Sequence, residues 1–315
     1  MSPLRTVTRS PAVSARCRPD STGPPARHHQ LYVGRPLTDV YNRTWCNPTE
    51  FVNVTRATDA LVLVARESPA AAGVLGTHAD RLRDRAVTDT VHSATWEEEP
   101  GRELHGVFEG IAADRTFVVP VRAAHARATT DGVPAAFGAC TGEVTYCEPA
   151  GPSPAVTDAI ADRAAEHVRP GPDASLLLVG LGSGDQPFER QAADYHATRL
   201  QQMTDYGEVT TAFLLQNPAV ECARYAVTND RVVAVPLPLV PSAATAEEMP
   251  RKLEVDRGGL SYTSPLADHP AVTEAIAARV AERRGGETDE PTASFEDELA
   301  REGQRLAADG DGRSL

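Results

Sequence analysis

The stretch PAVTDAIADRAAE at residues 154–166 returns as PAVTEAIAARVAE at residues 270–282. Ten of the thirteen positions are identical, and the two stretches begin 116 residues apart. Three further pairs occur in the same order: LVLVARES (61–68) with LLLVGLGS (176–183), HADRLR (78–83) with HATRLQ (196–201), and RTFVVPV (115–121) with RVVAVPL (231–237). The sequence therefore predicts an internal duplication, with copies at 58–172 and 173–285.

Each copy alternates between two kinds of segment. Short Val/Leu runs of four to eight residues are typical of buried parallel strands, and the longer amphipathic stretches between them are typical of helices. In residues 154–168, Val156, Ile160 and Ala164 fall on one helical face, and Pro154 stands where a helix begins. We expect an α/β fold with two tandem doubly wound lobes that face each other across a cleft, where ligands bind at the carboxyl ends of the strands.

The chain of 315 residues is long enough for two domains, and its ends differ from the duplicated part. Residues 1–57 carry eight arginines against three acidic residues and many prolines, which predicts a basic, partly disordered segment without the apolar core of a signal peptide. Residues 286–315 predict an acidic helix with a frayed end. We expect both termini to be poorly ordered.

Composition excludes several classes of protein. The formal net charge of −13 argues against nucleic-acid binding, and no apolar run approaches the length of a membrane span. The five cysteines include no C-x-x-C pair, which disfavours a zinc or iron–sulfur site and favours reduced thiols. We therefore expect a soluble, cytoplasmic protein.

The order of elements resembles the class II tetrapyrrole chelatases, specifically the sirohydrochlorin cobaltochelatase and ferrochelatase family. That family ends its first strand with Gly-His-Gly-Ser, carries Phe-Leu-Glu on its second strand, and ends its third strand with Val-Pro ahead of a loop histidine. Here GLGSGD (180–185), the two Val-Pro pairs and the repeated PAV helix starts match this framework over about residues 58–285. The resemblance implies insertion of a divalent metal into a tetrapyrrole, for which imidazole and carboxylate groups hold the metal and accept two pyrrole protons.

This sequence departs from the family at the residues that handle the metal. The first-strand histidine is replaced by Arg66 and Leu181, and the loop histidine by Ala128 and Ala244. The second-strand glutamate is kept as Glu97 in the first copy, whereas the second copy has Leu215.

The candidate site residues follow from these matches. Glu97 and a displaced His125 are the candidate catalytic residues and metal ligands. The candidate substrate-binding residues are Arg66, Ser68, Gly182 and Ser183. The arginine and the backbone N–H groups of the glycine turn would bind carboxylates of the substrate. We expect an asymmetric cleft, with Arg66 beside Glu97 in the first copy and an apolar rim in the second.

Two further pairs of matching residues are expected to have structural roles and not to belong to the site. His78 and His196 lie inside the first helix of each copy, and Tyr146 and Tyr262 accompany the fourth strand. We expect packing roles for all four.

The function is left open between two classes. One is a chelatase with a degenerate site in cobalamin or sirohaem biosynthesis, which would have cobalt, nickel or iron as a substrate and no permanently bound cofactor. The other is a non-catalytic relative that binds a tetrapyrrole or metal, or serves as a scaffold for protein contacts. The expected partner is a tetrapyrrole, with no nucleic acid and no membrane, and self-association stays open.

Overall fold

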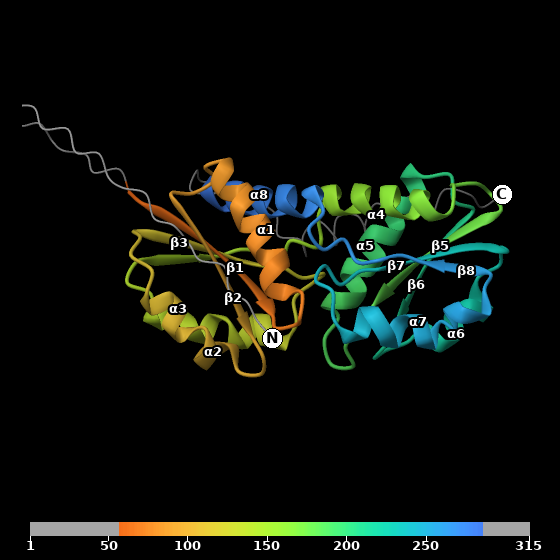
Figure 1. Ribbon diagram of the computed structural model, residues 1–315, viewed down its shortest axis with the longest axis horizontal. Coiled ribbons are helices and arrows are strands. Elements are labelled where there is room, and N and C mark those ends of the chain that lie inside the picture. Colours follow the sequence, from red (N-terminus) through yellow and green to blue (C-terminus); the bar gives the residue numbers. More distant parts are fainter. Residues whose placement is uncertain (1–56, 286–315) are drawn as a thin grey trace, which may run out of the picture. The chain divides into compact units, whose positions relative to one another are not determined.

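Two four-stranded parallel sheets form the framework of the protein (Figure 1). The computed structural model describes residues 57–285, so the predicted tail 286–315 and all but the last residue of the segment 1–57 lie outside the described residues. The first sheet has the order β2 (Thr90–Trp96), β1 (Asp59–Arg66), β3 (Arg115–Pro120), β4 (Glu143–Tyr146). The second has the order β6 (Glu208–Phe213), β5 (Ala174–Gly180), β7 (Arg231–Pro236), β8 (Leu260–Tyr262). The predicted fold class of two doubly wound α/β lobes is confirmed.

The two sheets are built alike down to their prolines. Pro120 and Pro236 each end the third strand of their sheet, paired with Val64 and Val179 of the first strand. Pro154 and Pro270 each begin the last helix of their copy. These are the equivalent places that the repeat in the sequence predicts.

Helices cover both faces of each sheet (Figure 1). They are α1 (Ala71–Asp84), α2 (Pro100–Glu103), α3 (His105–Glu109), α4 (Pro154–His167), α5 (Phe188–Met203), α6 (Val220–Ala226), α7 (Met249–Lys252) and α8 (Pro270–Gly285). Two π-helical turns, η1 (Ala128–Gly132) and η3 (Ala244–Glu248), follow the third strands, and two 3₁₀ turns, η2 (Pro134–Ala139) and η4 (Val255–Arg257), precede the fourth. Within residues 57–285, none of the helices has the length and apolar character to cross a membrane.

The last helix of each copy packs on the sheet of the other copy. Helix α8 contacts α1 and β3, whereas α4 contacts β7 and α5. Ion pairs join α8 to the first copy: Glu274 to Arg85, at the end of α1, at 2.7 Å, and Arg284 to Asp59 of β1 at 2.8 Å. The copies 58–172 and 173–285 repeat in the sequence, but each packing unit combines the sheet of one copy with the last helix of the other. We call the first sheet with α1–α3 and α8 lobe 1, and the second sheet with α4–α7 lobe 2.

Matching histidines hold the exchanged helices. His78 of α1 bonds through Nδ1 to Thr273 of α8 at 2.8 Å, and His196 of α5 bonds through Nδ1 to Thr157 of α4 at 2.8 Å. Both imidazoles are at most 2 % exposed, so burial lowers the pKa of each, for His196 to about 3. They act as neutral hydrogen-bonding groups between helices, which is the packing role expected of them.

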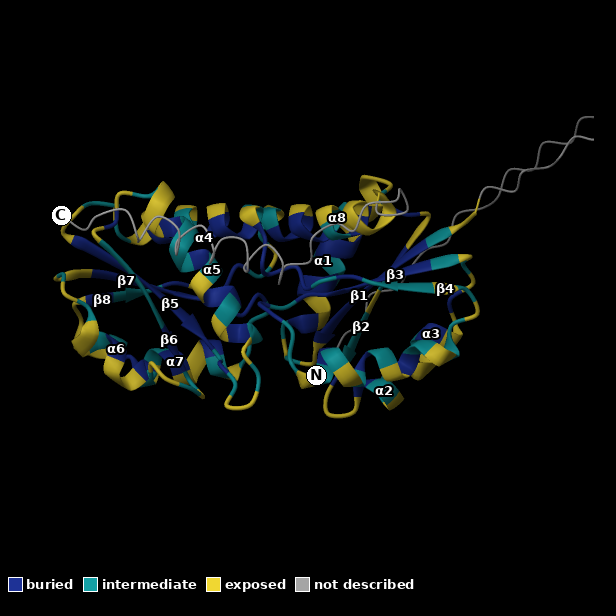
Figure 2. Cartoon of the chain, turned by 180° about the vertical axis from the view of Figure 1, so that it is seen from behind, coloured by how far each residue is buried: buried dark blue, intermediate teal, exposed yellow. Residues whose placement is uncertain are grey.

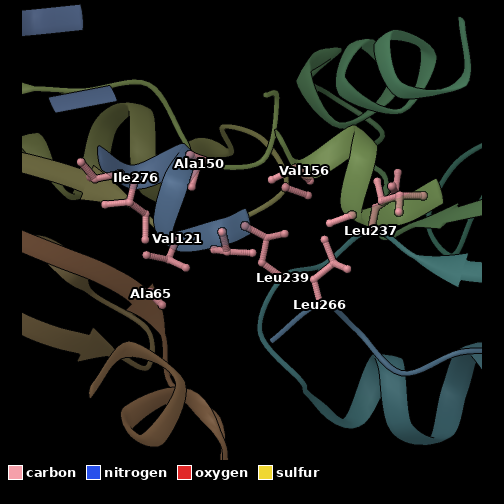
Figure 3. Close-up of a cluster of buried hydrophobic side chains, with 14 of the residues drawn as sticks. Ala65, Val121, Ala150, Val156, Leu237, Leu239, Leu266 and Ile276 are labelled. Carbon is pink, nitrogen blue, oxygen red and sulfur yellow. The ribbon is translucent and has the colours of Figure 1, made fainter. Parts of the chain in front are cut away.

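One apolar core runs through both lobes. It joins Ala65 and Val121 of lobe 1 to Leu237, Leu239 and Leu266 of lobe 2 (Figure 3). The inner strands β1, β3, β5 and β7 are buried along most of their length, while the outer surfaces of the covering helices are exposed (Figure 2). Because the shared core continues between the sheets, the strand ends of the two lobes are held against each other.

Candidate functional site

A cavity of about 150 Å³ lies where the two lobes meet at the carboxyl ends of their central strands. Residues 65–68 at the end of β1 and 121–123 after β3 line it from lobe 1. Leu181 after β5, Glu189 in α5, and residues 238–240 and 242 after β7 line it from lobe 2. This is the edge of a doubly wound sheet at which ligands bind, because the loops that follow parallel strands converge there.

One end of the cavity carries an ion pair that joins the lobes. Nη2 of Arg122 lies 3.1 Å from Oε1 of Glu189, and the two side chains are 21 % and 5 % exposed. The backbone N–H of Gly182 also donates to the Glu189 carboxylate. Burial raises the pKa of Glu189, and the guanidinium of Arg122 opposes that shift.

Arg66 and Ser68 both line the cavity, and their role as substrate-binding residues stays a prediction. Arg66 is exposed, and its guanidinium forms no hydrogen bond or ion pair within residues 57–285. The Ser68 hydroxyl instead donates to the carbonyl of Pro241 at 2.8 Å, which adds a hydrogen bond between the lobes. A free guanidinium at this rim is available to an anionic group of a ligand.

The predicted anion cradle at Gly182 and Ser183 is occupied by the protein's own carboxylates. Gly182 donates its N–H to Glu189, and the Ser183 hydroxyl donates to Asp185 at 2.5 Å. Gly182 has φ +79°, and a Cβ there would lie 2.7 Å from Gln216, which explains the glycine. Neither residue lines the cavity. Their role in binding substrate stays a prediction.

Glu97 lies on the exposed turn that follows β2, outside the cavity. Its backbone N–H donates to Oε2 of Glu103 at 2.7 Å, but its carboxylate has no hydrogen bond or ion pair in the described part of the chain. Arg66 pairs with Trp96 in the β1–β2 register, so the two chain segments are neighbours. The expected ion pair between Arg66 and Glu97 is nevertheless absent from residues 57–285, because both side chains stay in solvent.

His125 belongs to a different cluster. Its Nδ1 lies 3.2 Å from the Thr129 hydroxyl, and its Nε2 lies 3.2 Å from Oε2 of Glu148. The imidazole also contacts the rings of Tyr146 and Phe188, the latter from lobe 2. The hydrogen bond from His125 lowers the pKa of Glu148 against the effect of burial. Both ring nitrogens are thus already used.

The structure brings no metal site together in the part that it describes. Residues 57–285 contain no group of three or more His, Cys, Asp or Glu side chains arranged to hold a metal ion. The joint role of Glu97 and His125 as metal ligands and catalytic residues accordingly stays a prediction. Sequence reasoning assigned no role to Glu189, since its partner Arg122 lies 67 residues away in the other lobe and only the fold joins them.

Comparisons with known proteins find relatives of this chain and of its fold. Residues 175–283 match the CbiX family. A probable sirohydrochlorin cobaltochelatase of Halobacterium salinarum is 27 % identical over 221 residues, which are 61 % of this chain and 75 % of that protein. Over these residues the chain is similar to the class II chelatases.

Solved chelatase structures share its fold. The sirohydrochlorin chelatase SirB from Bacillus subtilis, in complex with cobalt, aligns with a TM-score of 0.58 and 20 % identity over 74 % of this chain and 98 % of that one. A multi-domain protein from Deinococcus radiodurans with structural similarity to chelatases aligns with a TM-score of 0.59 and 25 % identity. That match covers 75 % of this chain, which spans 56 % of the Deinococcus protein.

Four residues stand where the family's histidines are expected. Two of them line the cavity, and two lie in the π-helical turns. Arg66 and Leu181 line the cavity at the ends of β1 and β5. Ala128 and Ala244 are the first residues of η1 and η3, where Tyr146 and Tyr262 bond the carbonyls of Thr129 and Thr245 at 2.7 and 2.8 Å. The tyrosines therefore have the packing role expected of them. Leu215 is 69 % exposed on the turn after β6.

Proposed function

We propose that this chelatase relative binds a carboxylate-bearing tetrapyrrole in the cavity between its lobes, and that its metal insertion is weak or absent. The observation that carries the proposal is the composition of the cavity wall. Arg66 and Arg122 supply positive charge from lobe 1, while Leu181, Leu239 and Val240 supply an apolar surface from lobe 2. Such a wall suits a flat apolar ring with anionic side groups.

Metal insertion requires more than this wall offers. A divalent metal such as cobalt, nickel or iron(II), here a substrate, needs nitrogen or carboxylate ligands, and the two pyrrole protons need an acceptor. No histidine is among the described residues that line the cavity. Its two carboxylates are Glu189, which is bound to Arg122, and the exposed Glu67. This supports binding over turnover.

The size of the cavity sets a condition on binding. Small-molecule sites commonly enclose about 300–1,000 Å³. The cavity of about 150 Å³ is smaller, so it would enclose only one edge of a tetrapyrrole. We expect the rest of the ring to lie over the exposed turns that follow β1 and β2, where Arg66 and Glu97 are found.

Catalysis by the remaining family residue is the competing function. The similarity to a probable sirohydrochlorin cobaltochelatase favours it. In that case Glu97, helped by His125 after movement of the loop 121–134, would hold the metal and accept protons. We further propose that the protein acts in the cytoplasm without a permanently bound cofactor.

The test is a titration of sirohydrochlorin followed by its visible absorption spectrum. We expect a saturable band shift with protein alone, and cobalt insertion no faster than in protein-free solution. Replacement Arg66→Gln should weaken binding, whereas Arg127→Gln should not, because Arg127 is 79 % exposed and lies outside the cavity. The absence of any band shift would refute binding, and cobalt turnover that Glu97→Gln abolishes would establish the enzyme instead.

A further inference from the structure

Arg122 is incompletely hydrogen-bonded for a guanidinium at the wall of a cavity. A guanidinium has five N–H donors. Within residues 57–285, Arg122 uses one nitrogen, Nη2, in its contact with Glu189. Its Nε–H is buried and has no hydrogen-bond partner there. Nη1 likewise has no hydrogen bond within residues 57–285, and it is not among the buried atoms of this side chain, which is 21 % exposed at the cavity wall. Its donors are therefore the ones suited to a second oxyanion.

The surroundings of Arg122 restrict what that oxyanion is attached to. Val121 and Ala123 flank it in the sequence, and Leu239 and Val240 face the same cavity from lobe 2. A small hydrated anion would leave this apolar surface uncovered. A carboxylate on an apolar body would satisfy the guanidinium and cover the surface together.

Glu189 occupies the other side of the same guanidinium. It is 5 % exposed, and its only ion-pair partner within residues 57–285 is Arg122. Its negative charge fixes the guanidinium in place but also repels a second carboxylate that approaches Arg122.

We propose that Arg122 is the residue that recognises a ligand carboxylate in the cavity between the lobes, and that Glu189 limits its affinity. This inference deepens the proposed function and rests on it only for the identity of the natural ligand. It predicts opposite effects for the two members of one ion pair. Loss of the guanidinium weakens carboxylate binding, and loss of the Glu189 charge strengthens it.

A purely structural ion pair predicts a different pattern. If Arg122 and Glu189 only join the lobes, Arg122→Gln and Glu189→Gln lower stability alike, and neither changes the preference for a carboxylate. The sign of the change in affinity therefore separates recognition from structure. Gln at position 189 keeps an oxygen for Gly182 and Arg122, which favours folding of this variant.

The experiment compares 1-pyrenebutyrate with its neutral alcohol, 1-pyrenebutanol, by fluorescence titration of the full chain. Both probes carry the same flat apolar body, so their ratio of dissociation constants reports the carboxylate alone. We expect wild type to prefer the carboxylate, Arg122→Gln to lower that preference about tenfold or more, and Glu189→Gln to raise it. Arg127→Gln is the control, since it removes the same charge from the same loop outside the cavity.

The outcomes also separate this inference from the proposed function. Carboxylate preference without any sirohydrochlorin binding would refute the tetrapyrrole and leave the role of Arg122 standing. Sirohydrochlorin binding that is unchanged in both variants, with no carboxylate preference in wild type, would overturn the role of Arg122. If Arg122→Gln unfolds, Arg122→Lys and Glu189→Gln replace it. A rise in carboxylate preference in Glu189→Gln follows only if Arg122 recognises the carboxylate.

Discussion

Protonation of His196 should make the fold sensitive to acid well above the pH at which carboxylates titrate. The imidazole bonds Thr157 through Nδ1 at 2.8 Å, and its other nitrogen donates to the Gly151 backbone. Burial lowers its pKa from 6.5 to about 3. An unfolded chain therefore takes up a proton near pH 6.5, while the folded chain resists it down to about pH 3.

The magnitude follows from linkage between protonation and folding. Below pH 6.5 the unfolded state binds one more proton at this site, so stability falls by about 1.4 kcal/mol for each pH unit. At about pH 5 the loss attributable to His196 is therefore about 2 kcal/mol. This contribution to stability is fully present above pH 6.5, the pKa of His196 in the unfolded chain, and is lost as the pH falls towards 3.

The assay is urea unfolding of wild type and His196→Gln, followed by circular dichroism at several pH values between about 5 and 7.5. Near neutrality the variant should be less stable by about 1–3 kcal/mol, because buried hydrogen-bonding groups lose their partners. That deficit should shrink by about 2 kcal/mol at pH 5, since only wild type retains the titrating imidazole. Other titrating groups cancel in the difference.

The control is His105→Gln, an exposed histidine at the first position of α3. Near neutrality its free energy of unfolding should differ from that of wild type by no more than about 0.5 kcal/mol, because the side chain is exposed. A deficit in His196→Gln that stays constant between pH 7.5 and 5 would refute the reasoning. It would show that His196 has nearly the same pKa in the folded and unfolded states.

Three further substitutions test other parts of the structure. Tyr146→Phe removes the hydroxyl that bonds the carbonyl of Thr129 at 2.7 Å, and should cost about 1 kcal/mol in urea unfolding; a neutral result would mean that water replaces the bond. Gly182→Ala should destabilise the fold by at least about 1–2 kcal/mol, because φ +79° strains an L-residue and the new Cβ would meet Gln216. Unchanged stability would contradict this backbone geometry. Leu215→Ser should alter stability by no more than about 0.5 kcal/mol, because Leu215 is 69 % exposed, and a larger loss would reveal a packing contact that the exposure does not show.

The sequence by itself determined the class of fold and the plan of the sheets. The repeated helix, the Val/Leu runs and the two Val-Pro pairs predicted parallel α/β units, and the strands at 59–66, 115–120, 174–180 and 231–236 lie where those patterns stand. Local patterns suffice here because hydrophobic periodicity and proline positions act within one element. They also located the strand ends at which Arg66 and Leu181 line the cavity.

Only the tertiary structure decided how the copies share their helices and which charges meet. The exchange of α4 and α8 leaves no local signal, since an apolar helix face fits either of two similar sheets. The pairs His78–Thr273 and Arg122–Glu189 join residues 195 and 67 positions apart. The separation of His125 from the cavity has the same origin: Glu148 and Thr129 already bond its ring. Contacts between distant residues depend on the packing of whole elements. Residue order alone therefore predicts neither the Arg122 donors that lack a partner in residues 57–285 nor the Glu189 carboxylate that restrains the guanidinium.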